Sequence, residues 1–60
     1  MINVKKNQKY VSDAGTLVRV VTKGYYMASI TNIDKRGRAV KNTFRTVQVD
    51  SIRRRYKLVA

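Results

Sequence analysis

Two neighbouring segments are predicted to be β-strands: the first consists almost entirely of Val, Leu and Thr, and the second places its apolar side chains with a period of two, which is the pattern of a half-buried strand. The segments are residues 16–22 and 25–33, and a turn at residues 23–24 separates them. Both are rich in the β-branched and aromatic residues that favour strands. The alternation predicts two strands, with Arg19 facing outward and the following residues facing inward: Val18, Val20, Tyr26, Ala28 and Ile30.

A basic hairpin loop is predicted at residues 34–38, directly after the second strand. Gly37 supplies a positive φ, and the Asp34 carboxylate caps the turn. Residues 38–42 then form the return strand, with Val40 facing inward. The loop places several cations at one exposed tip.

Another strand is predicted over residues 43–49, where β-branched and aromatic residues dominate. Phe44 lies on one face of this strand, whereas Val47 and Val49 lie on the other. We expect Phe44 in the core together with these valines, but residues on opposite faces of a regular strand cannot all point into one core. A bulge near residues 45–46 would resolve the conflict.

The C-terminal residues allow two interpretations. Asp50 is a good N-cap residue, which favours one helical turn over residues 50–52, followed by a last strand over residues 53–59. The alternative is a longer helix over residues 51–58, in which two large apolar residues four apart share one face. We favour the turn and the strand, because the apolar residues at the C-terminus suit a closing strand. Its inward residues are then Tyr56 and Leu58.

Five short segments with tight turns and no Pro predict an all-β domain of four or five antiparallel strands. Closure into a small barrel removes exposed strand edges. Residues 10–60 make up this barrel, and residues 1–9 are a basic N-terminal arm or a short extra strand. A chain of 60 residues leaves room for one thin core and no large substrate cavity.

Four parts of the sequence carry a resemblance to a known fold: residues 15–21, residues 24–30, Gly37 and residues 49–53. The second reads Gly-Tyr-Tyr-Met-Ala-Ser-Ile and the last Val-Asp-Ser-Ile-Arg. In this order they resemble the SH3-like barrel, especially its KOW and Tudor-like members and the basic retroviral integrase C-terminal domain. The resemblance spans residues 10–59 and implies DNA binding. A methyl-lysine cage is disfavoured, because the chain has no Trp, one Phe and no evident acidic partner for a cage.

Composition narrows the function. Fourteen Lys and Arg against three Asp give a net charge of +11, which attracts polyanions. Without His or Cys there is no zinc finger, catalytic thiol or imidazole base. We therefore expect no enzyme, no cofactor and no metal. No apolar run is long enough to span a membrane and no secretory signal is visible, so we expect a cytoplasmic protein without a membrane partner.

Two groups of cations are the predicted binding site. One is the hairpin tip with Lys35, Arg36 and Arg38. The other lies on the last strand, where Arg53, Arg55 and Lys57 share one face at a repeat of ~7 Å, close to the phosphate spacing, and Arg54 points away. Arg45 extends this row from the neighbouring strand, and Tyr25 is the best candidate for an exposed ring that stacks on a base.

DNA is the most favoured partner, bound at its phosphates without sequence selection, because no recognition helix is expected. RNA or the ribosome is one alternative, and an acidic protein bound by a small inhibitor or adaptor is another. The small size, the lack of Pro and the one-sided charge suit a phage or mobile-element accessory protein. A homodimer stays open.

Overall fold

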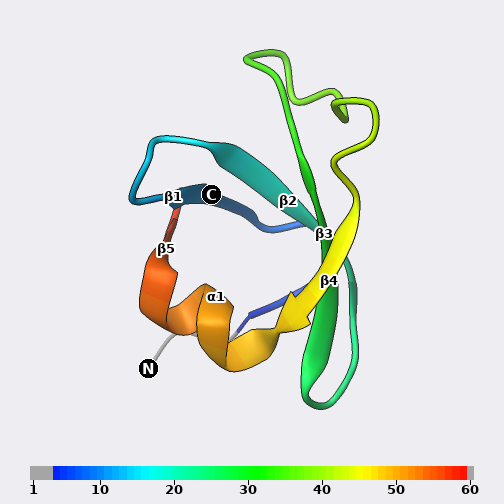
Figure 1. The fold of residues 1–60 in the computed structure, drawn as a ribbon, viewed down its shortest axis with the longest axis vertical. Coiled ribbons are helices and arrows are strands. Elements are labelled where there is room, and N and C mark those ends of the chain that lie inside the picture. The colour runs from blue at the N-terminus through cyan, green and yellow to red at the C-terminus, as the bar shows by residue number, and fades with distance from the viewer. Residues whose placement is uncertain (1–3, 60) are drawn as a thin grey trace.

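The computed structural model describes residues 4–59, which form five strands and one helix (Figure 1). In chain order the elements are β1 (Lys9–Ser12), β2 (Leu17–Lys23), β3 (Met27–Asn32), β4 (Arg45–Gln48), α1 (Val49–Arg55) and β5 (Tyr56–Leu58).

The strands form one antiparallel sheet in the order β4-β3-β2-β1-β5. The sheet is strongly curled, and α1 connects its two edge strands, β4 and β5, across the open side (Figure 1). The predicted all-β barrel, with a helical segment before the last strand, is confirmed. It positions two loops at opposite ends of the long axis: the β3–β4 connection and the β2–β3 turn (Figure 1).

The inner faces of β2 and β3 largely follow the alternation in the sequence. Val18, Val20 and Ile30 are fully buried and Ala28 is 2% exposed, as predicted. The register shifts between Val20 and Thr22, so the bulge lies in β2. The bulge expected near residues 45–46 is absent from the β3–β4 ladder, whose register is continuous from Met27–Gln48 to Ile30–Arg45.

Tyr26 does not face inward, and this prediction is wrong. The Gly24 N–H donates to the Met27 carbonyl at 2.7 Å and closes the β2–β3 turn. Tyr25 and Tyr26 are therefore the two central residues of that turn rather than the first residues of β3, and Tyr26 is 75% exposed.

Phe44 is also outside the core, which corrects a second prediction. Val47 pairs with the buried Ala28 on the inner face, so the parity of β4 directs even-numbered residues outward. Phe44 is accordingly 62% exposed. The parity conflict is resolved by an exposed ring, without a bulge.

The predicted return strand over residues 38–42 does not form. Ala39 makes an isolated bridge with Ile33, and Val40 is 41% exposed rather than inward. Asn42 has a φ of 62°, a left-handed conformation that Asn tolerates but a regular strand excludes. The chain between β3 and β4 is therefore a long looped connection.

The C-terminal prediction is partly wrong, because α1 is longer than one turn. The helix starts after Gln48, which is the N-cap in place of Asp50, and continues through Arg55. β5 thus begins only at Tyr56, which packs against the core, and Leu58 is 43% exposed instead of inward. The three-residue β5 is an edge strand, so its end lies at the rim of the sheet.

The core is small and draws on nearly every element. It consists of Val4, Tyr10, Val18, Val20, Ala28, Ile30, Val49 and Ile52. Val4 precedes β1 and belongs to the N-terminal segment, which is held on β2 by the Asn7 N–H at 2.8 Å from the Val20 carbonyl. The Tyr10 hydroxyl donates to Gln8 Oε1 at 2.8 Å, and burial raises the pKa of Tyr10.

Candidate nucleic-acid interface

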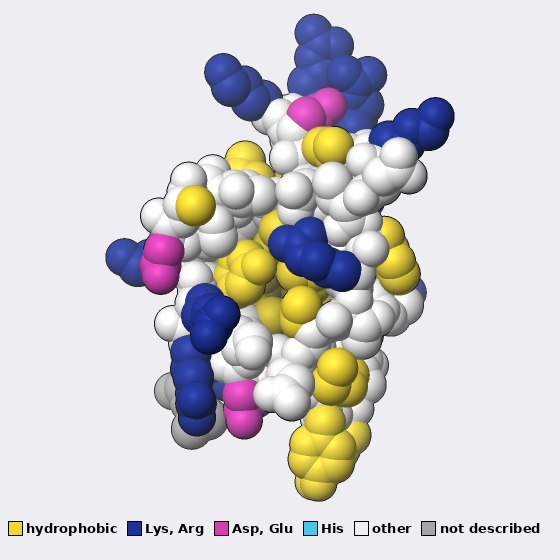
Figure 2. All heavy atoms as spheres, in the orientation of Figure 1, with side chains coloured by type: hydrophobic (Ala, Val, Ile, Leu, Met, Phe, Trp, Pro, Cys, Tyr) yellow, Lys and Arg dark blue, Asp and Glu magenta, His cyan; other side chains and the backbone are white. Residues whose placement is uncertain are grey.

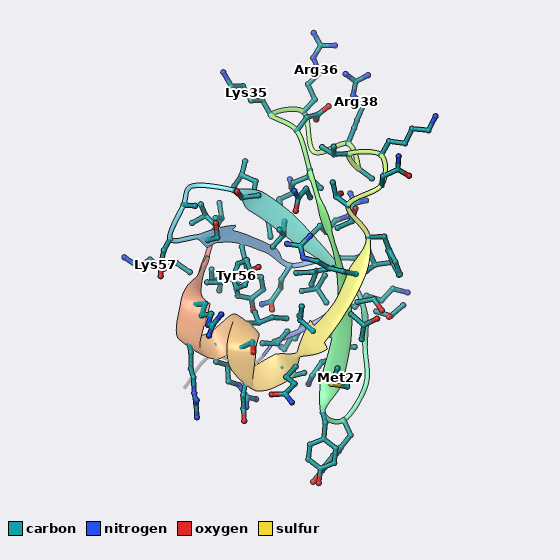
Figure 3. The ribbon with its side chains drawn as sticks, viewed as in Figure 1. Met27, Lys35, Arg36, Arg38, Tyr56 and Lys57 are labelled. Carbon is teal, nitrogen blue, oxygen red and sulfur yellow. The ribbon has the colours of Figure 1, made fainter. Side chains whose placement is uncertain are left out.

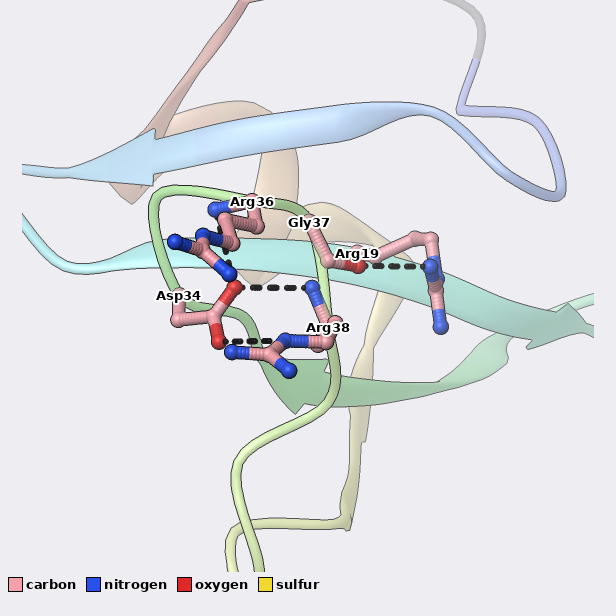
Figure 4. A network of polar contacts seen from close by, with 5 residues as sticks. All are labelled: Arg19, Asp34, Arg36, Gly37 and Arg38. Atoms are coloured by element: carbon pink, nitrogen blue, oxygen red, sulfur yellow. Dashed lines mark hydrogen bonds and ion pairs between the residues drawn. The ribbon is translucent and has the colours of Figure 1, made fainter.

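The loop at residues 34–38, which we call the basic hairpin, is organised by one carboxylate (Figure 4). Asp34 Oδ1 accepts the N–H groups of Arg36 and Arg38, each at 2.9 Å. Asp34 Oδ2 accepts Arg38 Nε at 3.2 Å. The N–H bond from Arg38 is the main cause that lowers the pKa of Asp34. The capping role predicted for this aspartate is confirmed.

The backbone and β2 hold the tip in place. The Gly37 N–H donates to the Asp34 carbonyl at 2.9 Å, and Gly37 has the predicted positive φ, at 81°. Arg19 projects outward from β2 and donates from Nη1 to the Gly37 carbonyl at 3.1 Å (Figure 4). Arg19 therefore holds the hairpin against β2, and the residue is half-buried.

The cations of the basic hairpin point away from the barrel. Lys35, Arg36 and Arg38 are exposed and extend beyond the end of β3 (Figure 3). Lys/Arg side chains gather at this end of the molecule (Figure 2), and the exposed Lys41 follows a few residues along the chain. The structure thus brings the first predicted group of cations together on one projecting loop.

The second predicted group has a different geometry. Arg53, Arg54 and Arg55 lie in the last turn of α1, so they do not form a strand row with Lys57. Arg53 is half-buried and donates to Asp50 Oδ1 at 3.3 Å, whereas Arg54 and Arg55 are exposed. Lys57 points away from the barrel, opposite to Tyr56 (Figure 3). Lys57 also lies well apart from Lys35, Arg36 and Arg38 of the hairpin (Figure 3).

Arg45 is engaged in the structure of the barrel. It pairs with Ile30 on the inner side of β4 and is half-buried. Its Nη1 donates to Asn32 Oδ1 at 3.0 Å and to the Thr43 carbonyl at 2.8 Å, and Nη2 lies 3.5 Å from the Tyr56 hydroxyl. This guanidinium ties three segments together and does not extend a row of surface cations.

Tyr25 is exposed as predicted, at 86%. Its neighbour Tyr26, which the sequence predicted to face inward, packs against it edge-on with ring centroids 4.5 Å apart, and Met27 is 42% exposed. We call Tyr25, Tyr26 and Met27 the aromatic tip. The sequence signal for the exposure of Tyr26 was the turn former Gly24, which ends the preceding strand just before the two rings.

Residues 4–59 contain no group of three or more carboxylate, His or Cys side chains that would hold a metal ion. Within the same residues, no helix is long and apolar enough to cross a membrane. Comparisons of the chain with protein-family models, curated proteins and solved structures found no significant match.

Proposed function

We propose that this protein binds duplex DNA through backbone phosphates, without sequence selection. The observation that carries the proposal is the basic hairpin, an ordered loop that projects Lys35, Arg36 and Arg38 from one end of the barrel. The planar fork of Arg pairs bidentately with phosphate oxygens. A loop that is already ordered loses little conformational entropy on binding.

The shape of the loop suggests how it meets the duplex. A narrow basic loop fits the minor groove, which is about 6 Å wide and strongly negative. The only helix among residues 4–59 buries Val49 and Ile52 against the sheet and has seven residues, so it is poorly suited to reading the major groove. Binding is therefore expected to depend on phosphates more than on base sequence.

The exposed cations near the C-terminus supply a second contact in this proposal. Arg54 and Arg55 end α1 and Lys57 lies in β5, away from the basic hairpin (Figure 3), so in this proposal they reach other phosphates of the same duplex. We leave Arg45 out of the interface, because its guanidinium serves the barrel. The proposal includes no catalytic role and fits a cytoplasmic accessory protein of DNA.

The test is a salt titration of binding to short labelled duplexes of unrelated sequence, followed by fluorescence anisotropy. Replacing Lys35 and Arg36 with Ala should lower the salt slope of the binding constant by about 2, equally for all sequences. The matched control, Lys5→Ala with Lys6→Ala, removes the same charge from exposed positions before β1 and should change the slope far less.

Four outcomes would contradict the proposal. An affinity that is independent of salt would exclude phosphate contacts as its basis. Equal losses in the hairpin variant and in the control would show that net charge matters but the hairpin does not. Tighter binding of duplex RNA than of duplex DNA would favour the RNA alternative, and retention of one acidic protein from nuclease-treated lysate would favour an adaptor.

A further inference from the structure

The aromatic tip is an apolar surface that the core leaves exposed. Tyr25 and Tyr26 are 86% and 75% exposed in a domain that has five aromatic residues. Full burial of one large side chain contributes about 1.5–3 kcal/mol. This small domain leaves both Tyr25 and Tyr26 exposed at one turn and so loses the stabilisation that their burial would contribute. The loss points to a ligand that covers the tip.

An open groove lies beside the tip, between the β2–β3 turn and the first turns of α1. The Val49 N–H donates to the Tyr26 carbonyl at 2.8 Å and fixes the turn against the helix. Lys23 and Arg53 line this groove together with Gln48 and the rings. Flat apolar surface, an amide and two cations thus meet in one place.

This combination matches the chemistry of a nucleotide outside a duplex. A nucleobase stacks on an exposed ring, and the adjoining phosphate is neutralised by a neighbouring cation. Gln48 supplies the donor and the acceptor that the edge of a base requires. A cationic ligand fits less well, because Lys23 and Arg53 outnumber Asp50 in the groove. The two rings also touch each other, which leaves no space for a cation between them.

We propose that the groove beside Tyr25 and Tyr26 binds an unpaired nucleobase of a single-stranded nucleic acid, with Lys23 and Arg53 contacting its phosphates. This site lies at the opposite end of the long axis from the basic hairpin (Figures 2 and 3). It is therefore separate from the proposed duplex contact. A protein with both sites binds duplexes that carry a single-stranded extension more tightly than blunt duplexes.

The experiment uses the full chain and short oligo(dT) as the probe. The chain has four Tyr and no Trp, so a base stacked on the tip quenches its intrinsic tyrosine emission. Replacing Tyr25 and Tyr26 with Ala should weaken oligo(dT) binding by about tenfold or more, since each stacked base is lost. The matched control, Tyr25→Phe with Tyr26→Phe, keeps both rings and should retain binding. For the Ala and the Phe variants, binding is measured by the fluorescence anisotropy of a labelled strand.

Further measurements distinguish base stacking at this site from binding through phosphates alone. An abasic strand of equal length should bind about tenfold more weakly than oligo(dT). The Ala variant should keep wild-type affinity for a blunt duplex, whereas the Lys35→Ala, Arg36→Ala variant should lose duplex affinity and keep tyrosine quenching by oligo(dT). An unchanged melting temperature would show that the Ala variant is folded, as expected for exposed rings.

The proposal is overturned if the Ala variant binds oligo(dT) as tightly as the wild type, or if the abasic strand binds as well as oligo(dT). It is equally overturned if the wild type is a dimer that the Ala variant dissociates, because the tip would then be an interface between two copies. Loss of duplex binding in the hairpin variant has no bearing on these arms, so the two proposals fail independently.

Discussion

The Asp34 carboxylate is the residue that sets the conformation of the basic hairpin, because it accepts three of the donors of the loop. The pKa of Asp34 is lowered, chiefly by the N–H of Arg38. A carboxyl whose folded pKa is depressed stabilises the fold above its ordinary pKa, and the contribution is lost as the pH falls through the lowered value. Acid should therefore release the hairpin. In an NMR titration, the amide shifts of Arg36 and Arg38 should change together with the Asp34 carboxyl, at a pH below the ordinary range of Asp.

Two variants isolate the cause. Asp34→Asn keeps an oxygen acceptor for both N–H groups, so the hairpin should stay ordered and its amides should no longer titrate in acid. Asp34→Ala removes the acceptor and should accelerate amide hydrogen exchange at Arg36 and Arg38 at neutral pH. If Asp34→Ala left this exchange unchanged, the carboxylate would not be what orders the loop.

Individual residues also show which features of the fold could be predicted from the sequence and which could not. The Asp34 cap and the Gly37 turn were predictable, because both follow from contacts within five residues. Phe44 and Tyr26 were not, because large rings are usually buried and composition gives no reason to leave them outside. Their exposure depends on the β3–β4 register and on the closure of the β2–β3 turn, which are properties of paired strands.

At the scale of elements, α1 joins the two ends of the sheet by burying two of its seven residues. Ile52 is fully buried and Val49 is 4% exposed. Truncation of a buried Ile costs about 2–5 kcal/mol. Since the total stability of a domain this small is of similar size, Ile52→Ala should leave the chain largely unfolded at room temperature. Urea denaturation followed by circular dichroism measures this loss.

Two further variants serve as controls for that prediction. Ile52→Val removes one methylene and should cost about 0.5–1.5 kcal/mol, which leaves a folded protein. Arg54→Ala, on the exposed side of α1, should stay within about 0.5 kcal/mol of the wild type. A cost below about 1 kcal/mol for Ile52→Ala would contradict the role of α1 as part of the core.

The length of α1 was open in the sequence, because its residues suit both a strand and a helix. The spacing of Val49 and Ile52 puts both on one helix face, and Asp50 in the first turn with Arg in the last favours a helix through its dipole. These signals favour the longer helix. The apolar C-terminus favoured a strand, and the chain satisfies both by changing from helix to strand at Tyr56. Moving Arg53–Arg55 from a strand to a helix is what removes the predicted row of phosphate contacts.

For the whole molecule, charge opposes folding. A net charge of +11 is confined to a body of 27 × 18 × 17 Å. At an ionic strength of about 0.01 M the Debye length of about 30 Å exceeds these dimensions, so every cation repels every other. At about 0.15 M the screening length is near 8 Å, and only close neighbours still interact. In each of the ion pairs Arg38–Asp34 and Arg53–Asp50, at least one of the two side chains is more than half exposed. Such exposed pairs contribute little to stability, so the attraction that salt screens is smaller than the repulsion that it screens.

Stability should therefore rise with salt, against the usual weakening of surface ion pairs. We expect a gain of at least about 1 kcal/mol between these two ionic strengths, or about 4–8 °C in melting temperature for a domain of this size. Calorimetry in sodium chloride measures the shift. The variant Lys5→Ala with Lys6→Ala carries two fewer charges, so it should melt higher at low salt and respond less to added salt. A melting temperature that falls with salt would mean that local attraction outweighs the repulsion. The same balance predicts that a bound polyanion raises the melting temperature most where salt is lowest, because it both neutralises the cations and binds the folded state alone.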